Sequence, residues 1–148
     1  MTINEYTDLR NFCDTCISYS ILKKYINYKL NKTSSLLYYD DVLFRNIVLN
    51  KIFNPIKQLN LNLSGCKNIT DVSALGHVYD LNLNGCNKIT DVSALGHVHT
   101  LKLRWCNKIT DVSALGNVHT LDLSGCYKIT DVSALRNVHT LILFKKIE

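Results

Sequence analysis

A twenty-residue repeat fills most of the second half of the chain, and it constrains the fold more than any other feature. Four near-identical copies follow one another without a gap, and they occupy residues 61–80, 81–100, 101–120 and 121–140. A fifth copy begins at Leu141. A fixed period of this length is typical of arrays in which each unit is one small structural motif. Because a single unit cannot bury its own apolar face, neighbouring units must stack, and the repeat predicts a solenoid.

The pattern within one unit predicts a strand followed by a tight return. Leu121 and Leu123 alternate with polar residues, which is typical of a strand with one buried face. Apolar residues then recur at spacings of three, at Cys126, Ile129, Val132, Leu135 and Val138. That spacing suits a 3₁₀-like segment and is too short for a full helix. We therefore expect an α/β fold with about seven inward apolar side chains per unit. Neighbouring strands would lie about 4.8 Å apart, in a parallel sheet on a concave face.

The repeated motif LxLxxCxxITDVSALxxV resembles leucine-rich repeat proteins of the cysteine-containing kind. Leu61, Leu63, Cys66 and Ile69 match the LxLxxN/CxxI segment of that family, and the match recurs at steps of 20 residues. The ITDVSAL tract is most similar to short-repeat arrays of giant DNA viruses, and it is also similar to the ITDxxL tract of eukaryotic F-box/leucine-rich-repeat proteins. The resemblance covers residues 59–144 and implies a leucine-rich repeat solenoid, an architecture that carries many unrelated functions.

Residues 1–58 do not repeat, and we expect them to form a helical N-terminal cap on the repeat array of residues 59–148. Dense apolar residues between Thr7 and Leu30 predict one or two helices. The polar stretch Asn31–Ser35 interrupts them, and its serines are expected to cap the helix that follows. Within the next tract, LLYYDDVLFRNIVLNKIF, residues 47–49 suit either a helix end or an additional strand leading into the array.

An alternative for residues 1–58 follows from the layout of the chain. A short helical module ahead of leucine-rich repeats resembles F-box proteins, in which the module docks a ubiquitin-ligase adaptor and the repeats hold the substrate. The DVLFRNIVLN tract is loosely similar to the end of that motif, but the Leu-Pro opening of the family is missing, since Pro55 is the only proline.

A third alternative for the function of the chain is self-association. The last unit would end on an exposed strand at residues 141–144, with only Lys145 and Lys146 to blunt its edge.

Two columns of identical residues recur once per unit and are expected to be structural. The first column is cysteine, at Cys66, Cys86, Cys106 and Cys126. Stacked side chains point the same way, so this geometry is poor for a disulfide or a tetrahedral metal site, and we expect small buried thiols instead of a metal stripe or redox relay. The second column is aspartate, at Asp71, Asp91, Asp111 and Asp131. We expect these carboxylates to accept backbone N–H groups at the start of the return segment, with Lys88, Lys108 and Lys128 offsetting their charge.

A third column consists of His99, His119 and His139, with Tyr79 opening it. Imidazoles one strand apart could bind a transition metal or respond to pH. Only Asp80 supplies a nearby carboxylate, so we expect a partly exposed column that repeats because the unit was duplicated.

Cys13 and Cys16 form a lone CxxC without a second pair or a nearby histidine. We expect two small apolar residues on one helix face there, and not a redox or zinc site.

The unit of residues 101–120 departs most from the repeat, and its exceptions are the candidate binding residues. Lys102, Arg104 and Trp105 stand where neighbouring units carry Asn or Asp, Asn or Ser, and Gly. Trp and Arg are enriched in binding hot spots because each buries a large area with directed contacts. We expect a cationic and aromatic patch at the centre of the concave face, flanked by Asp122 and Asn82, that binds a protein partner. The alternative is drift in a redundant array, with the indole packed on a neighbouring turn.

Composition and charge narrow the function further. The net charge is +5, with +3 in residues 1–60 and +2 in residues 61–148, so neither part is a basic arm and nucleic-acid binding is not expected. The polar N-terminus is not expected to act as a signal peptide. The sequence has no apolar stretch of about 18 residues, and no nucleophile, general base or phosphate loop stands in a convincing setting. Its six cysteines suit a reducing compartment. We therefore expect a non-catalytic, cytoplasmic interaction module without cofactor, metal or membrane partner, in the host-cell cytoplasm if the protein is viral.

Overall fold

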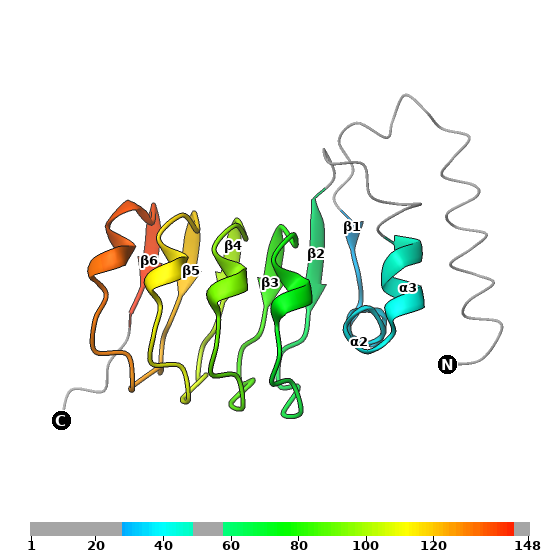
Figure 1. Cartoon of the computed structure of the whole chain (residues 1–148), viewed down its shortest axis with the longest axis horizontal. Helices are drawn as coiled ribbons and strands as arrows, with labels where there is room; N and C mark the ends of the chain where they lie inside the picture. Colours follow the sequence, from blue (N-terminus) through cyan, green and yellow to red (C-terminus); the bar gives the residue numbers. More distant parts are fainter. Residues whose placement is uncertain (1–27, 49–57, 144–148) are drawn as a thin grey trace.

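The computed structural model describes residues 28–48 and 58–143. Its strands and α-helices are β1 (Tyr28–Lys29), α2 (Lys32–Asp40), α3 (Val42–Ile47), β2 (Leu59–Asn62), β3 (Asp80–Asn82), β4 (Thr100–Lys102), β5 (Thr120–Asp122) and β6 (Thr140–Ile142). Four 3₁₀ turns alternate with the strands, at η3 (Ser73–Leu75), η4 (Ser93–Leu95), η5 (Ser113–Leu115) and η6 (Ser133–Asn137). The strands β1 to β6 form one parallel sheet in chain order along the length of the molecule (Figure 1).

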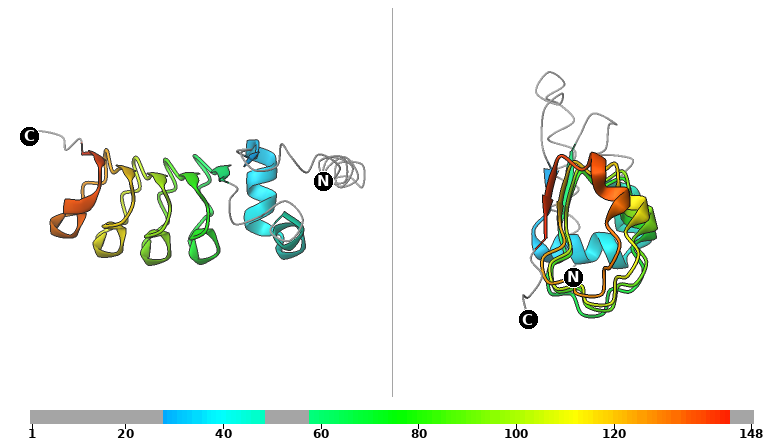
Figure 2. Two further views of the ribbon diagram at one scale, coloured as in Figure 1. Left: turned by 90° about the horizontal axis from the view of Figure 1, so that it is seen from above. Right: turned by 90° about the vertical axis from the view of Figure 1, so that its left-hand side faces the viewer.

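Each repeat contributes one strand and one 3₁₀ turn, so the array has two rows. The register advances by one unit per strand, and Leu81 pairs with Leu61 on one side and with Leu101 on the other. In the view along the stack, the strands lie on one side of each coil and the 3₁₀ turns on the opposite side (Figure 2). The predicted α/β repeat fold, with a parallel sheet and a 3₁₀ return segment, is confirmed. A strand and a 3₁₀ turn per unit is an arrangement found in short leucine-rich repeats.

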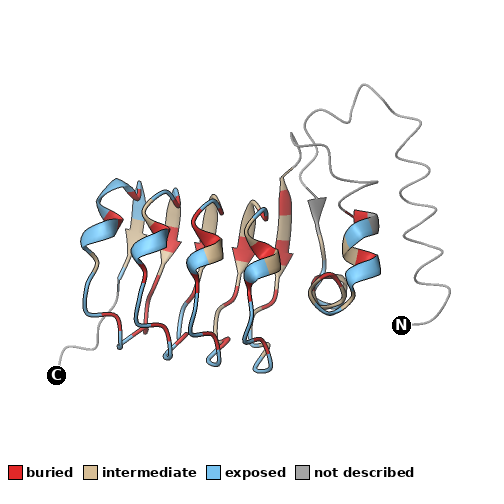
Figure 3. Cartoon of the chain, in the orientation of Figure 1, coloured by how far each residue is buried: buried red, intermediate tan, exposed pale blue. Residues whose placement is uncertain are grey.

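The core lies between the two rows as a series of thin layers. In the unit of residues 101–120 all seven apolar positions are buried, at Leu101, Leu103, Cys106, Ile109, Val112, Leu115 and Val118. Figure 3 shows buried positions recurring along each coil, while the outer parts of the 3₁₀ turns stay exposed. A layer of this size excludes water because the layers on either side cover it. The predicted inward set of side chains is therefore confirmed for this unit.

The aspartate column holds the start of each 3₁₀ turn. Oδ1 of Asp111 accepts a hydrogen bond from the backbone N–H of Ser113 at 2.8 Å, and the other three units repeat this contact at the same distance. This hydrogen bond stabilises the charged carboxylate and holds the pKa of Asp111 below its usual value. The predicted role of the column is confirmed. The predicted charge compensation is not seen as contact, because in the described part of the chain no ion pair joins Lys88, Lys108 or Lys128 to a carboxylate.

The cysteine column links each unit to the one before it. The thiol of Cys106 donates a hydrogen bond to the carbonyl oxygen of Leu83 at 3.2 Å. Cys86 and Cys126 make the same contact one unit earlier and one unit later, at 3.2 and 3.0 Å. Burial raises the pKa of Cys106 to about 12 and that of Cys86 to about 11, so both remain protonated and unreactive at neutral pH. This geometry matches the structural role predicted for the column.

The first strand of the sheet differs from the sequence prediction. The apolar pattern predicts helix up to Leu30, whereas Tyr28 and Lys29 form β1 and pair with the start of β2. The backbone N–H of Leu30 extends this pairing by donating to the carbonyl oxygen of Asn60 at 3.0 Å. Without β1, the outer edge of β2 would have unpaired backbone groups, and pairing satisfies them. The remainder of the predicted helical stretch, with Cys13 and Cys16, lies outside the described residues.

The start of α2 also differs from the prediction. Asn31 is the N-cap residue, because its side chain accepts a hydrogen bond from the backbone N–H of Ser34 at 2.8 Å. The serines lie inside the helix and do not cap it, which corrects the sequence-based interpretation. Ser35 has another function: its buried hydroxyl accepts a hydrogen bond from the backbone N–H of Asn62 at 3.0 Å. This contact ties α2 to β2.

The two α-helices lie beside β2 at one end of the repeat stack (Figures 1 and 2). Tyr38 of α2 and Phe44 of α3 are buried in the same apolar cluster as the first repeat. The hydroxyl of Tyr38 hydrogen-bonds Nε2 of His77, which follows η3. Because α3 extends to Ile47, the helix-end alternative holds at that residue. Neither helix of the described segments is long and apolar enough to cross a membrane.

Candidate partner-binding site

The five predicted binding residues come from three neighbouring strands and from the turn that follows β4. We call them the central patch: Asn82, Lys102, Arg104, Trp105 and Asp122. Lys102 ends β4 and pairs in register with Asn82 of β3 on one side and Asp122 of β5 on the other. Arg104 and Trp105 follow in the turn after β4. The side of the sheet that carries Asn82, Lys102 and Asp122 is called the sheet face below.

Both cations of the central patch have a carboxylate partner on a neighbouring strand. Nζ of Lys102 lies 3.9 Å from Oδ1 of Asp80, and Nε of Arg104 lies 3.6 Å from Oδ2 of Asp122. The two groups of the second pair differ in exposure, since the Asp122 side chain is 13% exposed and that of Arg104 is 49% exposed. Asp122 also accepts a hydrogen bond from the backbone N–H of Ser124 at 3.0 Å. The guanidinium is therefore held in place by Asp122 while remaining accessible to a partner.

Asn84 compensates for Lys102, and the sequence interpretation missed it. In the other units the strand residue of this column accepts the backbone N–H two residues later, as seen at Asn62, Asn82 and Asp122. Lys102 has no acceptor atom, so the N–H of Arg104 loses that partner. Oδ1 of Asn84, one unit earlier, accepts this N–H at 2.8 Å instead. The sequence signal for this contact was the column of Ser64, Asn84, Arg104 and Ser124. Asn84 has the longer side chain that reaches the next unit, in contrast to the two serines.

Trp105 has an unusual backbone conformation. Its φ is 63°, whereas the same position is glycine in the other three units, with φ between 71° and 79°. Positive φ is a genuine outlier for a bulky residue, because the Cβ atom crowds the backbone. The residue nevertheless keeps the hydrogen-bond pattern of the array, since its N–H donates to the carbonyl oxygen of Ser124 at 2.9 Å. The repeat thus holds an indole where its own pattern requires glycine.

The Trp105 indole is seated on the next unit. A Cβ atom at Gly125 would lie 2.7 Å from the indole, so the ring occupies the space above that glycine. Tyr127 contacts the indole edge-on, with ring centroids 5.9 Å apart and planes at 69°. The indole therefore packs on a neighbouring turn, as expected if Trp105 had arisen by drift. Trp105 nevertheless stays 52% exposed and Tyr127 46% exposed. Tyr127 was missed, although it departs from its column of Lys67, Asn87 and Asn107 in the same way as Trp105 departs from glycine.

A small hollow adjoins the central patch on the sheet face. It has a volume of about 110 Å³ and is lined by Asn60, Leu61, Asn62, Asp80, Asn82 and Lys102. The side-chain oxygen Oδ1 of Asn60 is buried and accepts no hydrogen bond from the described residues. The hollow thus combines amide, carboxylate and ammonium groups, which suits polar contacts with a partner.

The histidine column is a continuous stack of rings. Ring centroids are 4.4 Å apart between Tyr79 and His99, and 4.5 Å apart at each of the next two steps, with planes within 12° of parallel. Nδ1 of His99 lies 3.3 Å from the hydroxyl oxygen of Thr100, and the other two units repeat this contact. Burial, and then the neighbouring His119, lower the pKa of His99, which disfavours its protonation. Residues 28–48 and 58–143 contain no group of three or more His, Cys, Asp or Glu arranged to hold a metal ion.

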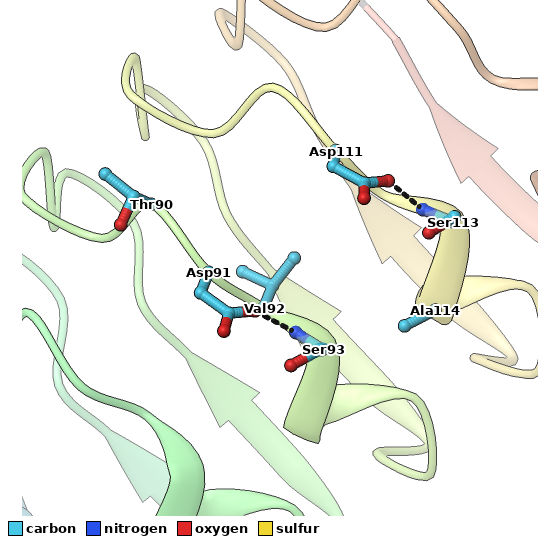
Figure 4. A pocket seen from close by; sticks show the side chains of 7 residues that line it. All are labelled: Thr90, Asp91, Val92, Ser93, Asp111, Ser113 and Ala114. Atoms are coloured by element: carbon cyan, nitrogen blue, oxygen red, sulfur yellow. Dashed lines mark hydrogen bonds between the residues drawn. The ribbon is translucent and has the colours of Figure 1, made fainter.

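A further groove lies on the 3₁₀ side, away from the central patch. It has a volume of about 340 Å³ and is lined by Thr90, Asp91, Val92, Ser93, Asp111, Ser113 and Ala114 (Figure 4). A similar groove of about 230 Å³ lies one unit earlier. In each unit the aspartate already accepts the backbone N–H of the serine two residues later, as the dashed lines in Figure 4 show. The grooves therefore follow from the repeat geometry, and no exception to the repeat lines them.

The chain matches no protein-family model and no curated protein. Among solved structures it is similar to internalin C2 of Listeria monocytogenes, with 21% sequence identity and a TM-score of 0.38. The similarity covers 72% of this chain and 57% of the internalin chain, so this chain spans a little over half of that protein. At this level the similarity supports no argument about fold or function. The α/β repeat architecture rests on the twenty-residue period, the parallel sheet and the 3₁₀ turns of this chain itself.

Proposed function

We propose that the protein is a non-catalytic interaction module and that a protein partner binds the sheet face, predicted to be concave, at the central patch. One observation carries this proposal: exceptions to a nearly perfect repeat gather at the ends of β4 and β5 and in the turns that follow these strands. Lys102, Arg104 and Trp105 come from one unit, and Asp122 and Tyr127 from the next. Drift alone would distribute such exceptions over both rows of the array. Among the large or charged exceptions of these two units, only Arg136 lies elsewhere, on η6.

The backbone of Trp105 supports a functional role for the indole. A non-glycine residue in the left-handed region costs roughly 1–2 kcal/mol. Selection for stability alone would favour glycine at this position, as in the other three units. Strained residues that persist are enriched at functional sites, where binding compensates for their cost. The half-exposed indole is thus best explained by a contact that it makes with a partner.

The sheet face suits recognition by shape and a few anchors. Each strand is hydrogen-bonded to both neighbours from β2 to β5, so the surface is preformed and little ordering entropy is lost on binding. Asp80 and Asp122 hold Lys102 and Arg104 across the strands, which orients both cations before a partner arrives. Trp and Arg at the centre of such a surface are the residue types that carry most binding energy.

The test uses variants that restore the repeat consensus. Arg104→Ser together with Trp105→Gly should leave the urea midpoint nearly unchanged, because the backbone cost of roughly 1–2 kcal/mol that glycine removes at position 105 is largely offset by the lost ring contact with Tyr127, worth about 0.5–1.5 kcal/mol. The double variant should nevertheless abolish binding of a partner first identified with the intact protein and then measured in purified form by calorimetry. Arg136→Gly is the matched control, since it also restores the consensus but lies on η6. Unchanged affinity of the double variant would remove the central patch from this proposal.

We also propose that residues 1–58 cap the repeat array of residues 59–148. Tyr38 and Phe44 support this role because they are buried against the apolar cluster of the first repeat. An uncovered first layer would expose its side chains to water. Phe44→Ala should therefore speed amide hydrogen exchange more in the first unit than in the unit of residues 101–120. Equal acceleration in both units would contradict a local capping role.

A second proposal concerns docking of a ubiquitin-ligase adaptor by the N-terminal segment. One observation favours it: Val42 and Leu43 of α3, within the tract similar to F-box proteins, are largely exposed apolar side chains. Exposed apolar pairs on a helix are typical of docking surfaces. Val42→Ser with Leu43→Ser should abolish adaptor binding by the full chain and leave sheet-face binding intact. Failure of the intact protein to bind an adaptor would overturn this proposal.

Self-association through β6 and a cytoplasmic location are further proposals drawn from the sequence. Within the described residues, β6 pairs with β5 on one side only. Exposed strand edges can template pairing with another chain. Light scattering at two protein concentrations separates a monomeric binder, with constant mass, from a self-associating array, whose mass rises with concentration.

A further inference from the structure

The turns that follow the strands form an edge of the molecule without negative charge. We call this the turn edge: residues 63–70, 83–90, 103–110 and 123–130. In Figure 1 these turns are the loops at the lower ends of β2 to β5. They carry five basic residues and no Asp or Glu, and the basic residues are Lys67, Lys88, Arg104, Lys108 and Lys128. The charged residues of the turn edge are thus all positive. The nearest aspartates in sequence lie just outside its bounds, and one of them, Asp122, is paired with Arg104.

The lysines of the turn edge are exposed and unpaired. Lys67, Lys88, Lys108 and Lys128 are all exposed, and within residues 28–48 and 58–143 none of them forms an ion pair. The aspartate column directly follows the turn edge in each unit, and there each carboxylate accepts the backbone N–H of a serine. Units repeat about every 4.8 Å, so like charges are held close together along this edge. Such an arrangement raises the local potential and attracts anionic groups.

The exposed aromatic pair lies on the same edge. Trp105 and Tyr127 both belong to the turn edge. Lys108 lies three residues after Trp105, and Lys128 directly follows Tyr127. The pair has an edge-to-face geometry at 69°, so it does not offer a series of coplanar platforms. Single-stranded nucleic acid is bound by aromatic faces on which successive bases stack. One non-parallel pair between cations is better matched to a single apolar side chain flanked by carboxylates.

We propose that the turn edge binds an acidic polypeptide segment of the partner, with carboxylates along Lys88, Lys108 and Lys128 and one aromatic side chain against Trp105 and Tyr127. This inference rests on the proposed function and deepens it by naming the chemistry of the partner. The cations supply charge complementarity and a fast, salt-sensitive encounter. The aromatic pair supplies the anchor that fixes the position of the segment.

The test uses Trp105, the only tryptophan of the chain, as an intrinsic fluorescent reporter. The probe is a synthetic peptide of glutamates with one central phenylalanine, and the controls are the same peptide with lysine for glutamate and a short oligothymidylate. The acidic peptide should change the Trp105 emission saturably, and its Kd should rise several-fold between about 50 and about 300 mM NaCl because salt screens exposed charges. Calorimetry under the same conditions gives a Kd that does not depend on the reporter.

Charge-removing variants locate the binding surface. Lys88→Gln, Lys108→Gln and Lys128→Gln combined should raise the Kd for the acidic peptide at least tenfold and flatten its salt dependence. Lys128→Gln alone should weaken binding more than Arg136→Gln, which removes one charge from the same unit but on η6. Circular dichroism checks that each variant keeps its fold, which is expected because all four side chains are exposed.

The outcomes separate this inference from the proposed function. No binding of the acidic peptide, equal binding of the lysine peptide, or binding of oligothymidylate in its place would each overturn an acidic protein segment as the occupant. The identified partner provides the second comparison. If it no longer binds the Arg104→Ser, Trp105→Gly variant but binds the triple lysine variant normally, the central patch stands and the turn edge fails. If it binds both variants normally, both proposals fail.

Discussion

The packing of the Trp105 indole against Gly125 can be tested by substituting two glycines that share one backbone conformation. Gly85 and Gly125 occupy the same position in their units, with φ of 73° and 79°. An alanine at either position adopts a left-handed conformation, which costs roughly 1–2 kcal/mol. At Gly85 the new Cβ would have its nearest contact at 3.8 Å, which is an ordinary van der Waals distance. Gly85→Ala therefore measures the backbone cost alone.

Gly125→Ala adds a clash to the same backbone cost. The new Cβ would lie 2.7 Å from Cε3 and 2.8 Å from Cδ2 of Trp105, so the indole has to leave its position. Because the ring is half exposed it can swing away, and the added cost is limited to the contacts that it loses. An aromatic pair such as that with Tyr127 contributes about 0.5–1.5 kcal/mol. Gly125→Ala should therefore destabilise the protein by roughly 1 kcal/mol more than Gly85→Ala.

The assay is urea denaturation followed by circular dichroism, combined with Trp105 emission in the native state. Gly125→Ala should shift the emission to longer wavelength as the indole moves into water, whereas Gly85→Ala should not. In a Trp105→Gly background the two alanine substitutions should cost the same, because no indole remains to clash. Equal costs in the wild-type background, or an unchanged emission maximum in Gly125→Ala, would refute the seating of the indole on Gly125.

Three further predictions follow from single contacts. Asn84→Ser removes the acceptor of the Arg104 backbone N–H, so it should lower the free energy of unfolding by about 0.5–1 kcal/mol in urea melts. Adding Lys102→Asn should restore the stability, because the asparagine at position 102 again accepts this N–H. Additive effects of the two substitutions would contradict the view that Asn84 compensates for Lys102. Burial and the neighbouring imidazole lower the pKa of His99, so the unfolded chain binds more protons below about pH 6.5. The free energy of unfolding should consequently fall as the pH drops below that value, and His99→Phe should flatten this slope in urea midpoints measured against pH. Burial raises the pKa of Cys106 to about 12, so mass spectrometry should find this thiol unmodified by iodoacetamide at pH 8 in the native protein and alkylated in urea.

The sequence predicts the array well because contacts within it follow the period. Once the alternation at Leu121 and Leu123 defines a strand, the stacking of units sets the parallel register and the buried layer without further information. The aspartate column was predictable for the same reason, since a short carboxylate two residues before a turn has few other donors within reach. A position that is identical in every unit has the same surroundings in every unit, so contacts predicted for one unit hold for the others.

Contacts that break the period could not be read in the same way. The pairing of β1 with β2 depends on which segment reaches the open edge of the sheet, and the local apolar pattern around Tyr28 carries no trace of it. Asn84 looks like a neutral variant of serine until the position of the Arg104 N–H is known. The comparison of units that identified Trp105 could also have identified Tyr127. The contact of Tyr127 with the indole, however, depends on the left-handed backbone of Trp105. The central patch was thus predictable in its residues, and its geometry was not.

The central claim is that a protein partner contacts the sheet face beside Trp105, and site-specific photo-crosslinking in cells tests it most directly. A benzoylphenylalanine replaces Trp105 in one variant and Asn117, an exposed residue beyond η5, in a matched control. The account predicts one defined protein adduct from position 105, identified by mass spectrometry, that is absent from position 117 and is reduced by Arg104→Ser. The same adduct at both positions, or a defined adduct at position 117 alone, would contradict it.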